Sequence, residues 1–302
     1  METIDSLKKT ISSTKDIKQV IKTMKSLAMA NVKNYIRAVD NLYFYKMNLE
    51  NAIHGLVKYG DFDETELFFN IESDKSKKKN LIIIFGSNQG LCGRFNDRIK
   101  EFLLNKLDKF KKEQKNEFIV VGNRLDMLLR DVENFDIVKS YEMPNTFAKI
   151  NLLTFEIIKF IEKDFKEKKL NKVFLYYTAN PENSSNGVPY TTQLFSMHKK
   201  YLDTFKKKNW LSKNVPVWNV DIMEMLTDIL KQYIFISLNN AFFNSVASEL
   251  KNRLITLQNA EKNIDDIIKT KQLEYNQKRQ LIITSQLLDV ISGWQLNKKN
   301  KV

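Results

Sequence analysis

Two long stretches of this chain lack both glycine and proline, the residues that most strongly interrupt helices. The first covers residues 1–54 and the second residues 221–292. Glycine costs about 1 kcal/mol and proline about 3 kcal/mol inside a helix, so their absence predicts two uninterrupted helices. At about 1.5 Å per residue the second helix would be roughly 105 Å long, longer than the core of any globular domain of this size. Most of it must therefore be covered by another helix or by other subunits.

Both stretches also repeat apolar residues in alternating steps of four and three, the heptad rhythm of a helix that packs along a partner. In the second stretch the seam positions are Leu250, Leu254, Leu257, Glu261, Ile264, Ile268, Lys271 and Tyr275. In the first stretch they are Ile17, Ile21, Met24, Ala28, Asn31, Tyr35, Ala38, Leu42, Tyr45, Leu49, Ala52 and Leu56. The spacing predicts an antiparallel coiled coil of the two terminal helices, with the rest of the chain inserted between them.

Two details of the first helix carry further expectations. Ile11, Thr14 and Ile17 are separated by two successive steps of three residues, which predicts a local overwinding of the coil. Asn31 is the one clearly polar seam position in this register, and a buried asparagine fixes register at some cost in stability.

Short apolar runs alternate with helical segments in the middle of the chain. Strands are predicted at 81–85, 118–121, 135–138, 173–178 and 188–195, and helices at 95–111, 124–130 and 147–168. The first run is apolar throughout, as in a strand buried on both faces. This alternation predicts an open, parallel α/β sheet. The expected division is a first helix at 1–58, a linker at 59–80, an α/β domain at 81–216, and a second helix with a basic tail at 217–302.

Composition excludes several classes of protein. The chain has one cysteine, Cys92, and two histidines, His54 and His198, so an internal disulfide is impossible and neither a zinc cluster nor Cys–His catalysis is expected. No stretch approaches the roughly eighteen uncharged apolar residues that a membrane span needs. The net charge of +13 would suit a polyanion such as nucleic acid or an anionic bilayer. Because the lysines are scattered and no nucleic-acid motif accompanies them, solvated faces and contacts with acidic subunits are the preferred explanation.

A turn punctuated by glycines, residues 86–93 (GSNQGLCG), follows the first predicted strand directly. In a dinucleotide site such glycines let the backbone approach a pyrophosphate at a helix N-terminus. Here the spacing is not G-x-G-x-x-G, and no Gly-Lys-Ser/Thr follows as in a P-loop. A tight structural turn without a cofactor is predicted. Ser245 and Ser248 lack the glycines of a nucleophile elbow, and no catalytic constellation is predicted anywhere in the chain.

Three blocks of the sequence resemble the gamma subunit of F-type rotary ATPases. The N-terminal block is residues 21–28 (IKTMKSLA). The central block consists of Gly90, Leu91, Cys92, Gly93, Phe95 and Asn96. The C-terminal block comprises residues 244–249 (NSVASE), Arg253, 258–260, Asn263, 275–280 (YNQKRQ), 283–284 and 290–293. Their order, from near one end of the chain to near the other, makes the resemblance full-length.

The resemblance implies that the coiled coil is a central shaft and that the inserted domain is Rossmann-like. The shaft would turn inside a hexamer of alternating alpha and beta subunits, and the beta subunits would carry the ATP chemistry. This chain would then have no catalytic residues and would bind no cofactor or metal. Its other partners would be the epsilon subunit and the c-ring of the membrane sector, on the cytoplasmic side of a bacterial membrane. Carried over by position, the hexamer contacts would be Met24, Lys25, Arg279, Gln280, Thr284, Leu287, Leu288 and Ile291.

Several alternatives remain open at this stage. The chain departs from the family pattern at Asn88-Gln89, Leu250-Lys251 and Trp294, which suits either a standard synthase or a specialised relative driving another ion or load. A non-enzymatic coiled-coil scaffold and a basic nucleic-acid-binding protein are the other classes. From Leu281 onward the second helix is apolar most of the way round and must be buried. It would either insert into a collar formed by other subunits or fold back on the α/β domain.

Overall fold

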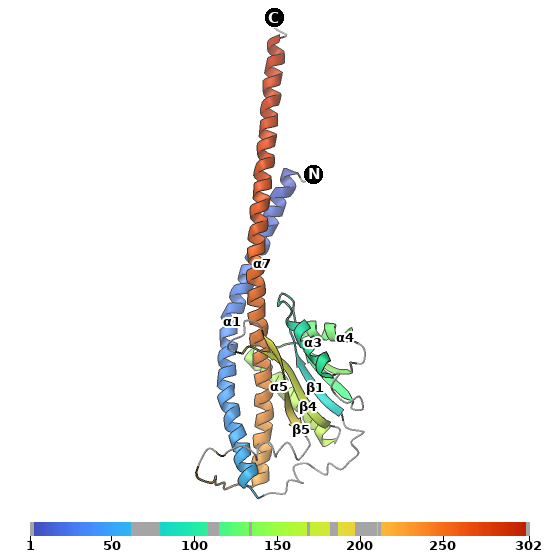
Figure 1. The fold of residues 1–302 in the computed structure, drawn as a ribbon, viewed down its shortest axis with the longest axis vertical. Helices are drawn as coiled ribbons and strands as arrows, with labels where there is room; N and C mark the ends of the chain where they lie inside the picture. Colours follow the sequence, from blue (N-terminus) through green and yellow to red (C-terminus); the bar gives the residue numbers. More distant parts are fainter. Residues whose placement is uncertain are drawn as a thin grey trace. The chain divides into compact units, whose positions relative to one another are not determined.

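The computed structural model describes residues 3–61, 79–107, 115–132, 135–167, 170–181, 187–196, 210 and 213–299. Two long helices, α1 (Ile4–Tyr59) and α7 (Ile222–Lys299), lie at the two ends of the chain (Figure 1). Between them come β1 (Lys79–Phe85), α3 (Phe95–Leu107), β2 (Asn116–Val121), α4 (Asn123–Arg130), β3 (Ile137–Tyr141), α5 (Phe147–Lys166), β4 (Leu170–Ala179) and β5 (Val188–Ser196). Most of the predicted linker, residues 62–78, lies outside the described residues.

The chain divides into two compact units. We call Met1–Ala28 with Leu254–Val302 the coil unit, and Met29–Arg253 the sheet unit. Both α1 and α7 contribute residues to each unit. The expected combination of an α/β domain with a long coiled coil is confirmed.

The sheet unit is built on five strands in the order β3-β2-β1-β4-β5. Strands β1 to β4 pair in parallel, but β5 runs antiparallel to β4, so the expectation of a wholly parallel sheet is wrong at this edge. The reason is the length of the connection, residues 180–187, because a parallel crossover needs about a dozen residues or more. β3 also begins later than predicted, because Phe135 precedes the strand and stacks on Phe118 at 4.3 Å between ring centroids.

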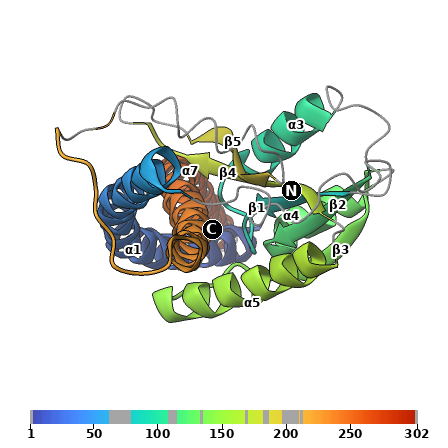
Figure 2. The same cartoon turned by 90° about the horizontal axis from the view of Figure 1, so that it is seen from below.

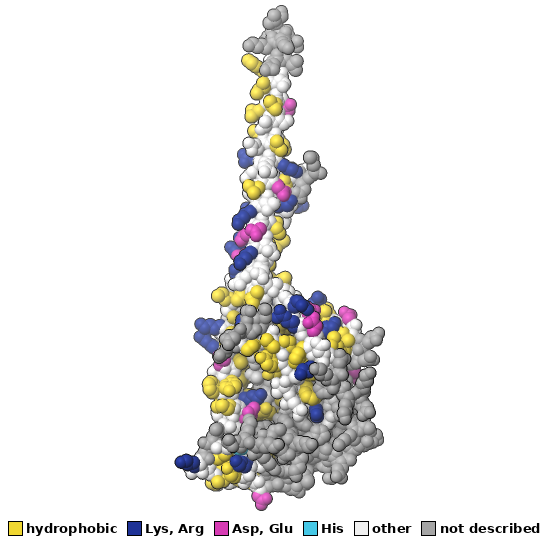
Figure 3. Space-filling model, in the orientation of Figure 1, with side chains coloured by type: hydrophobic (Ala, Val, Ile, Leu, Met, Phe, Trp, Pro, Cys, Tyr) yellow, Lys and Arg dark blue, Asp and Glu magenta, His cyan; other side chains and the backbone are white. Residues whose placement is uncertain are grey.

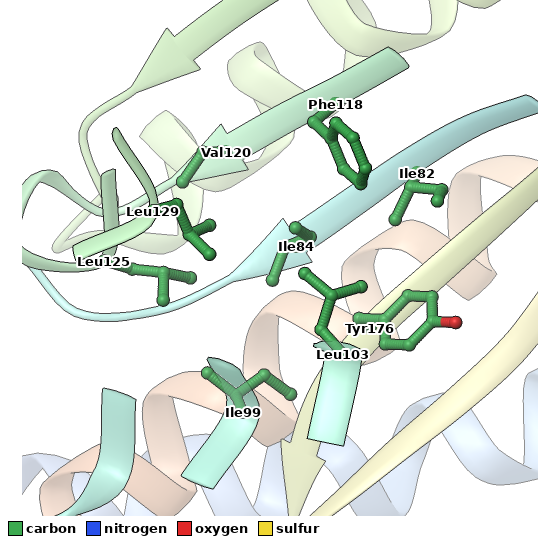
Figure 4. Packing of buried hydrophobic residues seen from close by; sticks show 9 residues of the cluster. All are labelled: Ile82, Ile84, Ile99, Leu103, Phe118, Val120, Leu125, Leu129 and Tyr176. Carbon is green, nitrogen blue, oxygen red and sulfur yellow. The ribbon is translucent and has the colours of Figure 1, made fainter. Parts of the chain in front are cut away.

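Helices cover both faces of the sheet (Figure 2). On one face, α3 and α4 close a core formed by Ile82, Ile84, Ile99, Leu103, Phe118, Val120, Leu125, Leu129 and Tyr176 (Figure 4). On the other face lie α5 and α7, with Phe85 of β1 edge-on to Phe242 of α7 at 4.7 Å. Every residue from Asn80 to Phe85 is buried, which confirms the prediction of a strand covered on both sides.

In the coil unit, α1 and α7 pack through a seam that differs from the predicted one. On α7 all eight predicted seam residues are buried or half-buried. On α1 the inward positions are Leu7, Ile11, Thr14, Lys18, Ile21, Lys25 and Ala28, in unbroken alternation of four and three. Ile17 is instead 54% exposed, so the predictions of Ile17 at the seam and of local overwinding are wrong.

Ion pairs across the seam explain that difference. Lys18 pairs with Asp265, and Lys25 pairs with Glu261. The neighbouring lysine charges lower the pKa of both carboxyl groups, through the hydrogen bond from Lys18 to Asp265 and from Lys25 to Glu261. Two seam positions are thus filled by lysines that reach acidic partners, a solution that a count of apolar residues misses. In the sheet unit Asn31 is exposed as well, and Val32 is the half-buried residue beside it.

We expect the charge reversal Lys25→Glu to lower the melting temperature of the full chain, because it places two carboxylates together at the seam. The double variant Lys25→Glu/Glu261→Lys restores the attraction with its direction reversed and should regain most of the loss. Circular dichroism at 222 nm as a function of temperature measures both. In about 1 M salt the differences should shrink, since the Debye length falls to about 3 Å. A double variant no more stable than the single one would show that the pair does not stabilise the coil.

Candidate functional site

The end of α7 is the largest uncovered apolar surface among the described residues of the coil unit. Among the α7 residues whose burial is described, Lys278 is the last half-buried one, and residues 279–292 are all exposed. We call residues 281–294 the tip. Its apolar side chains include Leu281 (69% exposed), Leu287 (58%), Leu288 (58%), Val290 (70%), Ile291 (50%) and Trp294 (65%). Figure 3 shows such side chains along this end of α7.

The register of the coil explains why the tip is uncovered. Residue 18 faces residue 265 and residue 25 faces residue 261, so the first helical residue of α1, Ile4, reaches about residue 280 of α7. α7 continues to Lys299 without a partner from α1. Between Leu281 and Ser292 the only charged side chain is Asp289. A contiguous exposed apolar surface of this kind marks an interaction site.

Polar groups next to the tip complete this surface. Within the described part of the chain, the side chains of Arg279 and Gln280 make no hydrogen bond or ion pair. Thr284 donates its hydroxyl to the Gln280 carbonyl at 2.9 Å, so only its lone pairs remain for a partner. The structure therefore brings together Arg279, Gln280, Thr284, Leu287, Leu288 and Ile291 on one helix end.

The structure does not bring Met24 and Lys25 to the same place. Lys25 faces Glu261, which precedes Arg279 by eighteen positions or about 27 Å of helix. Its ammonium group is engaged within the chain, and Met24 beside it is half-buried. Met24 and Lys25 therefore lie apart from Arg279 and Gln280, because the antiparallel register separates them along the coil.

The glycine loop, residues 86–93, is held by hydrogen bonds of its own side chains. The Asn96 side chain accepts from the Ser87 amide at 2.9 Å and donates to the Ser87 hydroxyl at 2.8 Å. The Ser87 hydroxyl in turn donates to the Gln89 carbonyl at 2.8 Å. Cys92 and Phe95 are both 2% exposed beneath the loop. These contacts give the central family block a structural role.

Two backbone amides at the start of α4 are bonded to the glycine loop. The Arg124 amide donates to the Ser87 carbonyl at 2.9 Å, and the Asn123 amide donates to the Asn88 side chain at 3.3 Å. Asn88 also exchanges two hydrogen bonds with the Met143 backbone, at 2.7 and 2.8 Å, which ties the loop after β3 to the loop after β1. These contacts fix the glycine loop against the start of α4 and the loop after β3.

A side chain at Gly122, just before α4, would clash with the backbone of the glycine loop. Gly122 has φ of 116°, and a Cβ added there would lie 2.8 Å from the Gly86 carbonyl carbon and 2.8 Å from the Ser87 oxygen. Both neighbours are backbone atoms, which cannot rotate away. Gly90 offers the opposite case, since a Cβ there would meet no atom within 4 Å.

The C-terminal block of the sequence explains how α7 contacts the sheet. The Thr178 amide donates to the Ser245 hydroxyl at 3.3 Å, and the Ser248 hydroxyl donates to the Thr178 carbonyl at 3.0 Å. Both serines are fully buried at the end of β4. One turn further, Glu249 is 8% exposed and lies 2.5 Å from an Arg253 nitrogen. Desolvation by burial raises the pKa of the Glu249 carboxyl to about 7, although the Arg253 charge opposes this shift.

Fold and surfaces together define a class of protein: a coiled-coil subunit with an inserted α/β domain and an uncovered apolar helix end. The chain belongs to the ATP synthase family, whose family model matches residues 3–295. No described helix combines the length and the apolar character that crossing a bilayer requires.

Individual relatives agree with this assignment over nearly the whole chain. The ATP synthase gamma chain of Pelagibacter ubique (strain HTCC1062) is 27% identical over 295 residues, covering 97% of this chain and 99% of the relative. The ATP synthase gamma chain of Clostridium botulinum (strain Kyoto / Type A2) is 26% identical over 292 residues, with 95% of each chain covered. Among solved structures, a chain of the Euglena gracilis mitochondrial ATP synthase OSCP/F1/c-ring complex has a TM-score of 0.67 at 14% identity, covering 99% of this chain and 95% of its own. This last likeness supports the fold.

We expect Gly122→Ala to destabilise the chain by about 2–4 kcal/mol, because it combines an unfavourable φ with a clash against backbone. Gly90→Ala is the matched control and should change the free energy of unfolding by less than about 0.5 kcal/mol. Urea unfolding followed by circular dichroism measures both. Equal effects of the two substitutions would contradict the steric explanation.

Glu249→Gln should change how stability depends on pH. In the folded state the carboxyl holds its proton up to about pH 7, whereas its ordinary pKa is 4.5. Between these pH values the folded state binds more protons than the unfolded state. The contribution of Glu249 to the stability of the wild-type chain therefore falls as pH rises. The stability of the Gln variant relative to wild type should therefore rise by about 3 kcal/mol from pH 4.5 to above pH 7 and then level off. A difference independent of pH in urea titrations would contradict the shift.

Proposed function

We propose that this chain is the central rotor shaft of an F1-type rotary ATPase. The observation that carries the proposal is the tip of α7, a charge-poor apolar helix end that extends past its own partner helix in a chain that matches the ATP synthase family throughout. A helix that is apolar all round requires a surrounding partner. A hexamer of alternating alpha and beta subunits, with the helix end on its axis, would supply one.

The chemistry of the tip suits a bearing. A shaft that turns inside a collar must break every directional bond that it makes, and apolar contacts have no preferred orientation. Leu287, Leu288 and Ile291 would supply these contacts. Arg279 and Gln280, at the boundary of the tip, would bond to hexamer loops at particular angles of rotation, where the guanidinium fork suits a carboxylate.

The remaining partners follow from the same role. The beta subunits would bind and hydrolyse or form ATP, and this chain would act as a non-catalytic subunit. The sheet unit would contact the epsilon subunit and the c-ring, which places the chain peripherally on the cytoplasmic side of a bacterial membrane. Met24 remains a proposed hexamer contact along the coil. Lys25 could serve there only if it kept or exchanged its Glu261 partner.

The test is purification of the tagged chain from its native cell, followed by subunit identification and native mass spectrometry. We expect one copy with three alpha-like and three beta-like subunits, and the other subunits present would identify the load. Leu287→Asp/Leu288→Asp should lower the yield of this complex by tenfold or more, since about 1.5–3 kcal/mol of burial is lost for each leucine. Met127→Asp, at a 60% exposed residue of α4, is the control and should leave assembly unchanged.

Two results would contradict the proposal. A free monomer or homodimer that never copurifies with such a hexamer would leave the scaffold function instead. A complex that tolerates both tip aspartates would show that the shaft is held elsewhere.

A further inference from the structure

A buried acid, Glu249, and a half-buried arginine, Arg253, on α7 lie against the glycine loop of the sheet unit. The carboxylate of Glu249 and a terminal nitrogen of Arg253 are 2.5 Å apart, and their side chains are 11% and 16% exposed. The same Arg253 nitrogen donates to the Gly90 carbonyl at 3.3 Å. One guanidinium group therefore connects the acid on the helix to the backbone of the loop.

The loop at the other end of this connection is held in an unfavourable conformation. Leu91 has φ of 59°, which is uncommon for a residue other than glycine, and its side chain is 52% exposed. Gly93 also has φ of 59°, so two left-handed residues lie within three positions. A segment with such a backbone persists only where surrounding contacts hold it.

The charged pair itself is incompletely hydrogen-bonded. Among the described residues, neither the Glu249 oxygen nearest Arg253 nor the Arg253 Nε has a hydrogen bond of good geometry. Burial raises the pKa of Glu249 to about 7, so its charge is only just maintained at neutral pH. Loss of that charge would leave a buried guanidinium group without its counter-ion, which is strongly unfavourable.

We propose that Glu249 and Arg253 form a pH-dependent latch on the glycine loop. When Glu249 is ionised it holds Arg253 in place, and Arg253 donates to the Gly90 carbonyl. When Glu249 takes up a proton, Arg253 turns toward solvent, the bond to Gly90 is lost, and residues 88–92 loosen.

Few of the described charged or titratable groups lie close enough to Glu249 to influence its protonation. In the part of the chain that the structure describes, the groups that interact electrostatically with Glu249 are Arg253 on its own helix and Cys92 beneath the loop. Burial raises the pKa of the Cys92 thiol, which therefore stays uncharged between pH 6 and 8.

Hydrogen–deuterium exchange of the purified full-length chain tests the latch. Peptides covering residues 88–92 are compared at pH 6 and pH 8 after correction for the intrinsic exchange rate, with β2 as the internal reference. Protection should be about tenfold greater at pH 8, because the ionised fraction of Glu249 rises from about a tenth to about nine tenths. In Glu249→Gln the amide mimics the protonated acid, and the loop should be weakly protected at both pH values.

Matched variants separate the latch from general effects of charge. Arg253→Gln should loosen the loop at both pH values, while Glu156→Gln, an exposed acid on α5, should behave as wild type. A wild-type loop whose corrected protection is the same at pH 6 and 8 would overturn the proposal, as would an unchanged pH profile in Glu249→Gln. Should a variant at 249 or 253 fail to fold, the wild-type profile against the β2 reference decides alone.

Discussion

The ion pairs Lys18–Asp265 and Lys25–Glu261 set the register on which the coil unit depends. Between Ile11 and Ala28 the seam of α1 has few apolar side chains, so packing alone would tolerate a slip by one heptad. Such a slip would move each lysine away from its acid and would cover or uncover about 10 Å of α7. The length of helix beyond Ile4, and with it the size of the tip, follows from the register in which these charges pair.

In the sheet unit the contact between α7 and the sheet buries polar groups, which must therefore form hydrogen bonds within the protein. Small residues on α7 let the helix approach the end of β4, and the Ser245 and Ser248 hydroxyls bond to the Thr178 backbone. The glycine loop does the same with Asn96, Ser87 and Asn88. Short polar side chains at these positions replace the apolar packing that larger residues would supply, and they fix position through directional bonds. The tip, by contrast, has exposed apolar side chains and few such bonds.

The sequence predicted the long helices, the seam of α7, the doubly buried strand β1 and the structural turn at residues 86–93, because each depends on local periodicity or on glycine spacing. Prediction from the sequence failed where contacts between residues distant in the chain determine which side chain is buried. Ile17 looked like a seam residue because it is apolar, yet Lys18 occupies the seam because Asp265 faces it. Trial pairing of the two helices in antiparallel registers, scored for opposite charges, could have found this. The direction of β5 was also predictable from its short connection, whereas the buried pair Glu249–Arg253 carries no periodic signal at all.

Two regions of α7 differ in the kind of contact they can make, which matters for a shaft that must be held firmly at one place and turn at another. From Phe242 to Arg253 the helix is fixed to the sheet unit by aromatic packing, serine hydroxyls and a buried ion pair, all of which are specific in direction. At the tip the exposed side chains are apolar and almost uncharged, and apolar contacts have no preferred orientation. One continuous helix without glycine or proline from Asp221 to Ser292 joins these regions. Because an α-helix of this kind lacks the residues that allow kinks, torque applied at one region can be transmitted to the other without a built-in break.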